Sequence, residues 1–189
     1  FDIGPKLGKD AVAIEINRKL YDTSYVITEN ASIKILTKKD IQSLSILRHS
    51  SAHLLAQAVL NLYPGTLYGV GPDIEDGFYY DFLFKENISD ADLPKIEKEM
   101  LKLSKANQLF VKSIQKKPDA MDLFKNQQFK MELIDSADES EGVEDSEVSL
   151  YSNNEFIDLC RGPHVPNTGF IKHFKLTRLG GAYWRGDEN

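Results

Sequence analysis

With 189 residues, of which 41% are hydrophobic and 28% charged, the chain can bury the core of one large domain or of a large and a small one. Charges interrupt its longest apolar runs, which excludes the roughly 20 apolar residues of a membrane helix, so we expect a soluble globular protein. The net charge of −6 argues against an extensive nucleic-acid surface. However, seven of the acidic residues lie between Asp135 and Glu147, in a segment that reads as a solvated loop. An RNA end therefore stays open as a partner.

The single cysteine, Cys160, excludes an internal disulfide and is compatible with a reducing compartment. Neither a signal peptide nor a transit peptide is visible in a sequence that opens at Phe1. We expect a cytoplasmic location.

The first region, residues 11–36, alternates in the manner of strands, with Asn17-Arg18 as a turn candidate. This pattern predicts a small β-rich unit, followed by a linker at residues 38–43. We therefore divide the chain into a small domain at residues 1–39 and a larger one at residues 40–189.

The second region opens with a predicted helix at residues 46–63, which Ser43 or Ser45 could cap and which Pro64-Gly65 ends. Two strand-like segments follow, at 66–70 and 77–84, and the Asp76-Gly77 pair between them is a strong hairpin signal.

A long amphipathic helix is predicted from Ser89, because Asp92 follows three residues later and an apolar stripe begins at Leu93. Beyond the acidic segment, two hairpins are predicted. The first joins residues 148–151 to 155–159 around Asn153-Asn154, and the second joins 170–179 to 182–185 around Gly180-Gly181. This order of elements predicts an α+β fold with an antiparallel sheet and packed helices.

Candidate chemistry concentrates in two pairs of residues. His49 and His53 are four residues apart on a predicted helix, so their rings project from one face. Cys160 and His164 repeat this spacing in DLCRGPH, where the Gly-Pro pair forbids a regular helix and predicts a shaped loop after a strand. A lone helical histidine is usually an ordinary half-buried residue, but the paired pattern favours one shared site.

Such a site admits two kinds of chemistry. One thiolate and three imidazoles are acceptable zinc ligands, and an open position on the metal would make the site catalytic. Alternatively, imidazoles and a thiol can order a water molecule without metal, while a carboxylate accepts its proton and a lysine steadies the anion formed from an ester. The residues alone do not choose between them.

Four strings closely resemble the amino-terminal editing domain of the threonyl-tRNA synthetase family. They are RHSSAHLLAQAV (48–59), GPDIEDGFYYDF (71–82), DLCRGPHVPNTG (158–169) and GAYWRGD (181–187). Residues 1–39 resemble the end of the β-grasp TGS domain that precedes it, without its first strand. The resemblance implies an α+β editing domain after a partial TGS-like unit.

The resemblance also implies an activity, the hydrolysis of seryl-tRNA(Thr). A missing methyl group is worth only about 1 to 3 kcal/mol in discrimination, so the site that attaches threonine to the tRNA also accepts serine too often. A second site must correct the error. The partner would be the 3′ end of tRNA(Thr) carrying serine. The family's editing site matches His49, His53, Tyr80, Lys130, Asp158, Cys160 and His164 of this sequence.

By resemblance, His49 and Tyr80 would shape the serine pocket and exclude the extra methyl of threonine. Asp158 and Cys160 would bind the amino group or orient the reacting end, and Lys130 would stabilise the oxyanion or position the water. The ordinary structural readings are a core aromatic for Tyr80, a loop acid for Asp158 and a surface residue for Lys130.

The family's ligase chemistry, with ATP, Mg²⁺ and its own zinc, belongs to domains beyond Asn189. Editing by the threonyl-tRNA synthetase family, in contrast to the alanyl-type editing proteins, is usually treated as needing no cofactor. A metal at His49, His53, Cys160 and His164 therefore stays doubtful. We expect a homodimeric parent enzyme and a monomeric fragment. Two other readings stay open: an alanyl-type editing protein, disfavoured by Arg161 and Pro163, and a non-enzymatic zinc- or RNA-binding module.

Overall fold

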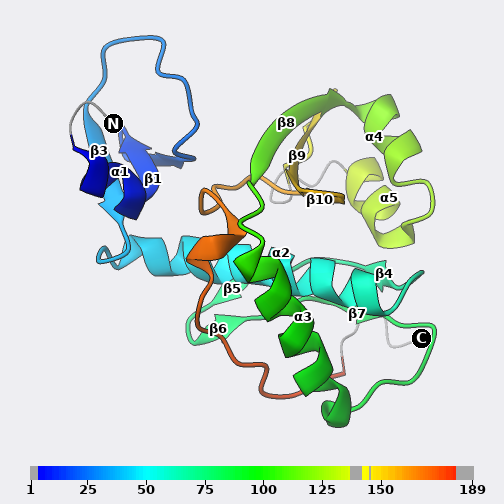
Figure 1. The fold of residues 1–189 in the computed structure, drawn as a ribbon. Coiled ribbons are helices and arrows are strands. Elements are labelled where there is room, and N and C mark those ends of the chain that lie inside the picture. The colour runs from blue at the N-terminus through cyan, green and yellow to red at the C-terminus, as the bar shows by residue number, and fades with distance from the viewer. Residues whose placement is uncertain (1–3, 137–141, 145, 182–189) are drawn as a thin grey trace.

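The computed structural model describes residues 4–136, 142–144 and 146–181 (Figure 1). Helices and antiparallel strands share the described chain, which confirms the predicted α+β class. No helix within these ranges is both long and apolar enough to span a membrane.

The N-terminal unit is a three-stranded antiparallel sheet of order β2-β1-β3 preceded by a short helix. Its turn at Asn17-Arg18 was predicted, and both residues have positive φ, 49° and 68°, as a two-residue hairpin turn requires. Its assignment to the β-grasp type and the boundary at residue 39 stay predictions. The elements are α1 (Pro5–Asp10), β1 (Ala11–Ile16), β2 (Lys19–Tyr21) and β3 (Ile33–Thr37).

Helix α2 (Gln42–Leu62) crosses the middle of the molecule (Figure 1). It begins four residues before the predicted start, so part of the expected linker is its first turn. Neither predicted cap serves as one: Ser43 Oγ donates to the carbonyl of Thr37 at 2.8 Å, and Ser45 Oγ donates to Asp73 Oδ2 at 2.6 Å. Both serines instead fasten the helix to flanking segments.

Short strands follow α2 in two antiparallel pairs. β4 (Leu67–Tyr68) pairs with β7 (Phe82–Leu83), and β5 (Asp73–Ile74) pairs with β6 (Gly77–Phe78) across the predicted hairpin. The strand predicted at 77–84 is therefore interrupted. At the interruption the Tyr80 ring turns over Gly71, where an added Cβ would lie 2.1 Å from the ring.

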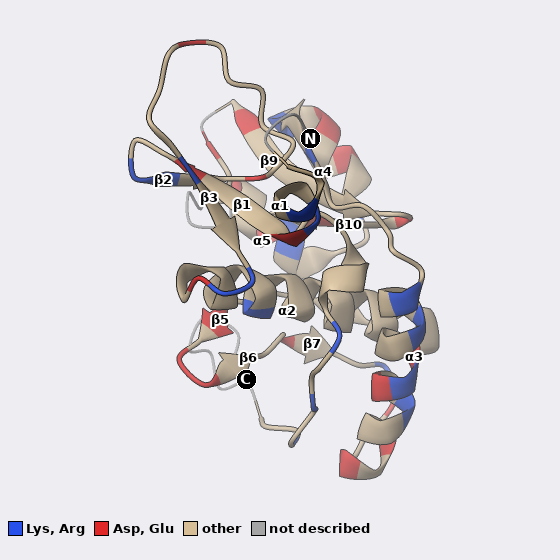
Figure 2. Cartoon of the chain, turned by 60° about the vertical axis from the view of Figure 1, so that its left-hand side comes forward, with Lys and Arg blue, Asp and Glu red and all other residues tan. Residues whose placement is uncertain are grey.

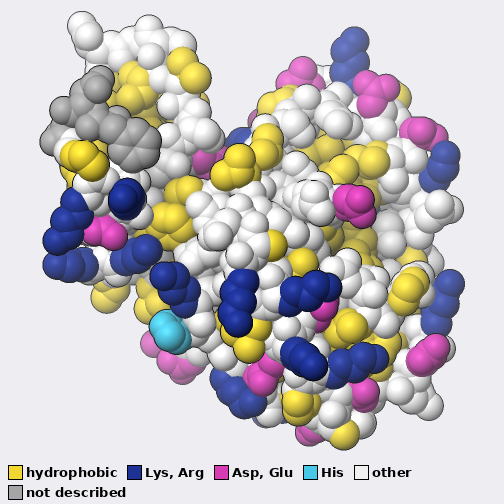
Figure 3. Space-filling view, viewed as in Figure 1, with side chains coloured by type: hydrophobic (Ala, Val, Ile, Leu, Met, Phe, Trp, Pro, Cys, Tyr) yellow, Lys and Arg dark blue, Asp and Glu magenta, His cyan; other side chains and the backbone are white. Residues whose placement is uncertain are grey.

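The helix predicted from Ser89 is confirmed as a 3₁₀ turn, η1 (Asp90–Asp92), that leads into α3 (Leu93–Lys105). The Ser89–Asp92 capping box forms, with the Ser89 amide donating to Asp92 Oδ2 at 2.9 Å. The apolar stripe is buried against α2, while the lysines lie on the outer face of the helix (Figure 2). Acidic side chains are interspersed with basic ones over this side of the molecule (Figure 3).

The second three-stranded sheet has the antiparallel order β10-β9-β8. The β9–β10 hairpin was predicted, but its turn lies one residue later, at Asn154-Glu155, with Asn154 at φ 57°. β8, α4 and α5 were not predicted; β8 exposes nearly all of its side chains, so its sequence shows no alternation of buried and exposed positions. The bounds are β8 (Val111–Lys116), α4 (Lys117–Leu123), α5 (Gln128–Asp135), β9 (Glu147–Asn153) and β10 (Phe156–Leu159).

The strand predicted at 170–179 is wrong. After a 3₁₀ turn, η3 (Thr168–Phe170), this segment forms no strand, because its amides find carboxylates instead of a neighbouring strand. Leu176 N donates to Glu97 at 2.7 Å and Leu179 N donates to Asp90 at 2.8 Å. The partner strand predicted at 182–185, like most of GAYWRGD, lies outside the described residues.

One hydrophobic core joins both regions of the chain. Val12 and Leu36 of the N-terminal sheet belong to the same buried cluster as Ile46 of α2 and Leu150 of β9. The N-terminal unit and the second region therefore pack against each other through a shared hydrophobic core.

Candidate functional site

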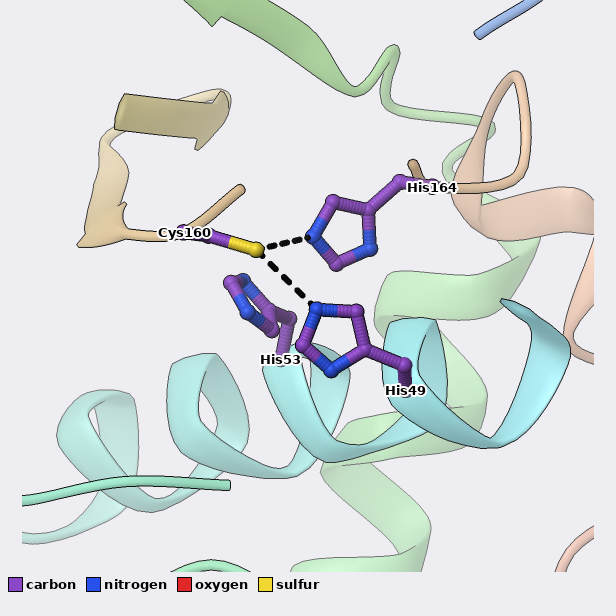
Figure 4. Close-up of side chains that lie close together, drawn as sticks. All are labelled: His49, His53, Cys160 and His164. Atoms are coloured by element: carbon purple, nitrogen blue, oxygen red, sulfur yellow. Dashed lines mark hydrogen bonds between the residues drawn. The ribbon is translucent and has the colours of Figure 1, made fainter. Parts of the chain in front are cut away.

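The two predicted residue pairs meet in space. His49 and His53 project from α2, Cys160 follows the last residue of β10, and His164 lies in the loop after it (Figure 4). One ligand atom from each lies within 4.8 Å of those of the other three. The tertiary fold thus assembles one cluster from residues more than 100 positions apart.

The tautomer of His49 follows from its neighbours. Its Nδ1 lies 3.3 Å from the carbonyl of Gly71, which can only accept, so Nδ1 carries the proton. In the neutral ring Nε2 then holds a lone pair, 3.0 Å from Cys160 Sγ.

His164 is fixed in the same tautomer by Ser50, which is fully buried. The only hydroxyl proton of Ser50 goes to the carbonyl of Ile46 at 2.8 Å, so Ser50 Oγ must accept from His164 Nδ1 at 2.9 Å. Ser50 Oγ also accepts from the Val165 amide at 3.1 Å. The lone pair of His164 Nε2 consequently faces Cys160 Sγ at 3.2 Å.

Two imidazole lone pairs thus converge on one sulfur. A thiol has one proton and can satisfy only one of them. The Gly162 amide additionally donates to the sulfur at 3.2 Å, which favours negative charge there. The cluster is rich in electron pairs, and either a proton or a metal ion can bind them.

The donor set fits a zinc ion. Three imidazoles and a thiolate are zinc ligands, and zinc bond lengths give ligand separations of roughly 3.5 Å in a tetrahedral site. His53 Nδ1 is buried and has no hydrogen-bond partner within the described part of the chain, so it too could be satisfied by a metal or a water. The cluster could therefore hold a metal.

Burial keeps these imidazoles uncharged. It lowers the pKa of His53 and of His164 well below the usual value, and neighbouring imidazoles lower both further. Burial also lowers the pKa of His49, against an opposing effect of its hydrogen bond to Gly71. At neutral pH each ring is therefore a proton acceptor.

A buried charged network adjoins the cluster. Lys130 Nζ, on α5, lies 2.5 Å from Asp158 Oδ1, 2.5 Å from the carbonyl of Gly69 and 3.2 Å from Tyr80 Oη. Tyr80 Oη donates a short hydrogen bond to Asp158 Oδ2, which lies 3.8 Å from His53 Nε2. Burial raises the pKa of Asp158, and the Lys130 ammonium and the Tyr80 hydroxyl oppose this shift.

An open cavity of about 1250 Å³ exposes part of this cluster. His49, His53, Asp158 and Cys160 line it, whereas Tyr80, Lys130 and His164 lie behind its wall. Its lining also includes three exposed cations, Lys19, Lys112 and Arg161.

The predicted site residues all lie at this place, although their catalytic roles stay predictions. The reading of Lys130 as a surface residue is wrong, because its side chain has no exposed area. Sequence reasoning missed Ser50, Gly71 and the cavity lining from β2. A serine beside His49 on a helix with many buried positions was a signal for Ser50, whereas β2 gave none.

Comparisons with known proteins match this chain to aminoacyl-tRNA synthetases. The family model described as "Threonyl and Alanyl tRNA synthetase second additional domain" matches residues 148–189. A threonine–tRNA ligase of Hahella chejuensis is 48% identical over 190 residues, which cover 100% of this chain and 29% of that protein. Threonine–tRNA ligases of Francisella tularensis subsp. novicida (47% identity, 99% of this chain, 29% of that protein) and of Desulfatibacillum aliphaticivorans (48%, 98% and 28%) are similar. The chain thus spans less than a third of the length of these relatives.

The lowered histidine pKa values predict a pH dependence of stability. Below the unfolded value of 6.5, the unfolded chain binds a proton at His164 that the folded chain refuses, so stability falls as pH decreases from 6.5 toward the lowered pKa. Each such proton contributes a slope of about 1.4 kcal/mol per pH unit. In His164→Asn the side-chain amide can still donate to Ser50 but cannot bind this proton. The substitution should therefore reduce the slope of unfolding free energy against pH by up to about 1.4 kcal/mol per pH unit. Urea unfolding between pH 5.5 and 7.5 measures both slopes, and equal slopes would contradict the assignment.

The Lys130–Asp158 pair predicts a large stability effect. Lys130→Met keeps the length of the side chain but leaves Asp158 buried without its ammonium partner. Removal of one member of a buried pair costs about 3 to 5 kcal/mol of unfolding free energy. Lys102→Met is the matched control, because Lys102 pairs with Glu99 on the exposed face of α3 and should cost at most about 1 kcal/mol. Similar losses in the two variants, measured by urea unfolding, would refute the role of the buried pair.

Proposed function

Because the whole chain aligns with threonine–tRNA ligases and belongs to their family, we propose that it carries the editing activity that hydrolyses seryl-tRNA(Thr). The observation that carries this proposal is the cavity wall, where the uncharged imidazole of His49, the thiol of Cys160 and the carboxylate of Asp158 lie together. These groups suit the attack of water on an aminoacyl ester.

The proposed substrate is the 3′ end of tRNA(Thr) esterified with serine. A ligase that selects threonine admits serine too often, since the two amino acids differ by one methyl group. An editing pocket that accepts serine and excludes threonine by steric conflict corrects the error. His49 is the proposed wall against the extra methyl, and Tyr80 supports it from behind Gly71.

Asp158 is the proposed anchor for the α-ammonium of the substrate. Its carboxylate reaches the cavity, while Lys130 and Tyr80 hold its oxygens from the buried side. An ammonium arriving from the cavity would add a second cation to a carboxylate that burial otherwise penalises. The anchor would place the ester carbonyl near the cluster.

His49 is the proposed general base. In this proposal the Cys160 thiol donates its hydrogen bond to Nε2 of the more buried His164. The Nε2 lone pair of His49 is then left to accept a proton from the attacking water. The pKa of His49 lies below its usual value, so the ring is ready to accept at neutral pH. Cys160 and His53 would orient the water and the ester.

Lys130 is proposed to position rather than to touch the substrate. Its ammonium has three oxygen neighbours, Gly69 O, Asp158 Oδ1 and Tyr80 Oη, so a direct contact with the oxyanion would require one of them to be released. Its positive charge still favours the oxyanion from behind the wall.

A bound zinc ion is the second candidate for the cluster, favoured by the convergence of two imidazole lone pairs on one sulfur. Held by all four of His49, His53, Cys160 and His164, zinc would have a closed tetrahedral site and would stabilise the fold. With a water in place of one of these ligands, it would polarise that water. Nothing in the proposed roles of Asp158 and Lys130 depends on it.

The remaining functional assignments rest on the resemblance of the sequence to the threonyl-tRNA synthetase family. The proposed parent is a homodimeric threonine–tRNA ligase of the cytoplasm, with ATP, Mg²⁺ and a further zinc ion in its synthetic part. Residues 1–39 are proposed as a TGS-like unit and residues 40–189 as the editing domain. tRNA is the expected partner, since the relatives are tRNA ligases.

The proposed function predicts selective deacylation. The chain should release serine from seryl-tRNA(Thr) and leave threonyl-tRNA(Thr) intact, in an assay at high protein concentration. His49→Asn should lower the rate by at least about 10²-fold, the lower range for loss of a general base. His173→Asn is the matched control, because His173 is the exposed histidine outside the cluster. Equal hydrolysis of both esters would refute the proposed selectivity. An active His49→Asn variant would refute the role of His49 as the general base.

Cys160→Ser separates the metal from the metal-free reading, because serine is a far poorer zinc ligand than a thiolate. If the cluster works without metal, the wild-type protein should purify with less than about 0.1 zinc per chain, and chelation should leave its deacylation rate unchanged. Elemental analysis before and after dialysis against a chelator measures this. One zinc per chain, lost in Cys160→Ser together with activity, would establish the metal reading instead.

A further inference from the structure

The N-terminal unit contributes to the cavity that holds the His/Cys cluster. Lys19, Leu20 and Tyr21, the three residues of β2, line the same cavity as His49 and Cys160. The residue that follows this strand, Asp22, reaches past the cavity wall to the loop that carries the cluster.

Asp22 accepts two hydrogen bonds from the second region. Its Oδ2 accepts from Tyr151 Oη at 2.5 Å, and its Oδ1 accepts from the backbone amide of His164 at 2.9 Å. These contacts join positions 129 and 142 residues apart in sequence. Both oxygens of one carboxylate are therefore engaged by groups of the candidate site.

Both partners of Asp22 determine where the Cys160–His164 loop lies. The Tyr151 ring meets the His164 ring edge-on, with centroids 4.5 Å apart. The Tyr151 hydroxyl also lies over Gly162, where an added Cβ would come within 2.0 Å of it. Tyr151 is 1% exposed, so its hydroxyl has little access to solvent as an alternative partner.

The charge state of Tyr151 suits this arrangement. Burial raises the pKa of its hydroxyl, and the negative charge of Asp22 raises it further. The hydroxyl therefore stays protonated and can donate to Asp22. A hydrogen bond to a charged acceptor is roughly twice as strong as one between neutral groups.

We propose that Asp22 is a positioning residue of the editing site, through which the N-terminal unit fixes the loop bearing Cys160 and His164. This inference rests on the proposed deacylase function. Without Asp22, the buried His164 residue loses the acceptor of its amide, and the loop is free to shift. A displacement of about 1 Å at a catalytic group can lower a rate by about 10²-fold.

The test compares two carboxylates of the N-terminal unit. Asp22→Ala should lower kcat for seryl-tRNA(Thr) deacylation by about tenfold to a hundredfold, with KM changed less than about threefold. Asp22→Asn, which keeps one acceptor oxygen, should recover part of the rate. Glu15→Ala is the matched control: Glu15 accepts from Gln42 of α2 at 3.3 Å and so also joins the two regions, but away from the cavity. It should leave kcat within about twofold.

Two measurements on the same variants do not depend on activity. Asp22→Ala should speed hydrogen exchange of the His164 amide and alkylation of Cys160 by iodoacetamide, each by at least about tenfold, because the loop opens more often. Glu15→Ala should change neither. Tyr151→Phe, which deletes one of the two hydrogen bonds and keeps the ring, should give an intermediate effect and serves if Asp22→Ala does not fold.

The outcomes separate the two proposals. A wild-type chain without deacylase activity would refute the proposed function, and amide exchange and alkylation would still decide the role of Asp22. If Asp22→Ala and Glu15→Ala show the same exchange, alkylation and kcat, Asp22 is an ordinary contact between the two regions and the inference is overturned.

Discussion

The buried ion pair between Lys130 and Asp158 constrains how the second region packs. Neither side chain has appreciable access to solvent, so each charge must be compensated inside the protein. The compensation comes from Gly69 O and Tyr80 Oη, which forces α5, the β4–β7 segment and β10 to meet. Cys160 lies two residues beyond Asp158, so the contact that satisfies the charge also carries the sulfur toward α2.

Helix α2 meets the same requirement with uncharged groups. Most of its middle is buried on all sides, including polar residues that need partners. Gln57 exchanges two hydrogen bonds with Asn153, and Ser50 accepts from His164 while donating to Ile46. The histidine cluster therefore forms part of a larger buried polar network. This network fixes the orientation of the imidazoles, and such preorganisation is what the proposed editing reaction would need.

The sequence was most informative where a local pattern has a local cause. The apolar stripe from Leu93, the Ser89–Asp92 capping box and the Asn17-Arg18 turn each form as predicted, since helix periodicity and turn geometry depend on neighbouring residues. The spacing of His49 and His53 belongs to the same class. Strand predictions failed where pairing depends on distant segments: the residues at 170–179 resemble a strand, but carboxylates on α3 and η1 take their amides.

By itself, then, the sequence determined the α+β class, the main helices and which residue types could form a site, because periodicity, capping and side-chain chemistry are local properties. The tertiary structure alone decided that Lys130 is buried against Asp158, that Ser50 sets the tautomer of His164 and that Asp22 reaches the loop bearing Cys160 and His164. These contacts join segments 28 to 142 residues apart. No spacing along the chain encodes them, since they depend on which buried polar groups find each other when the core closes.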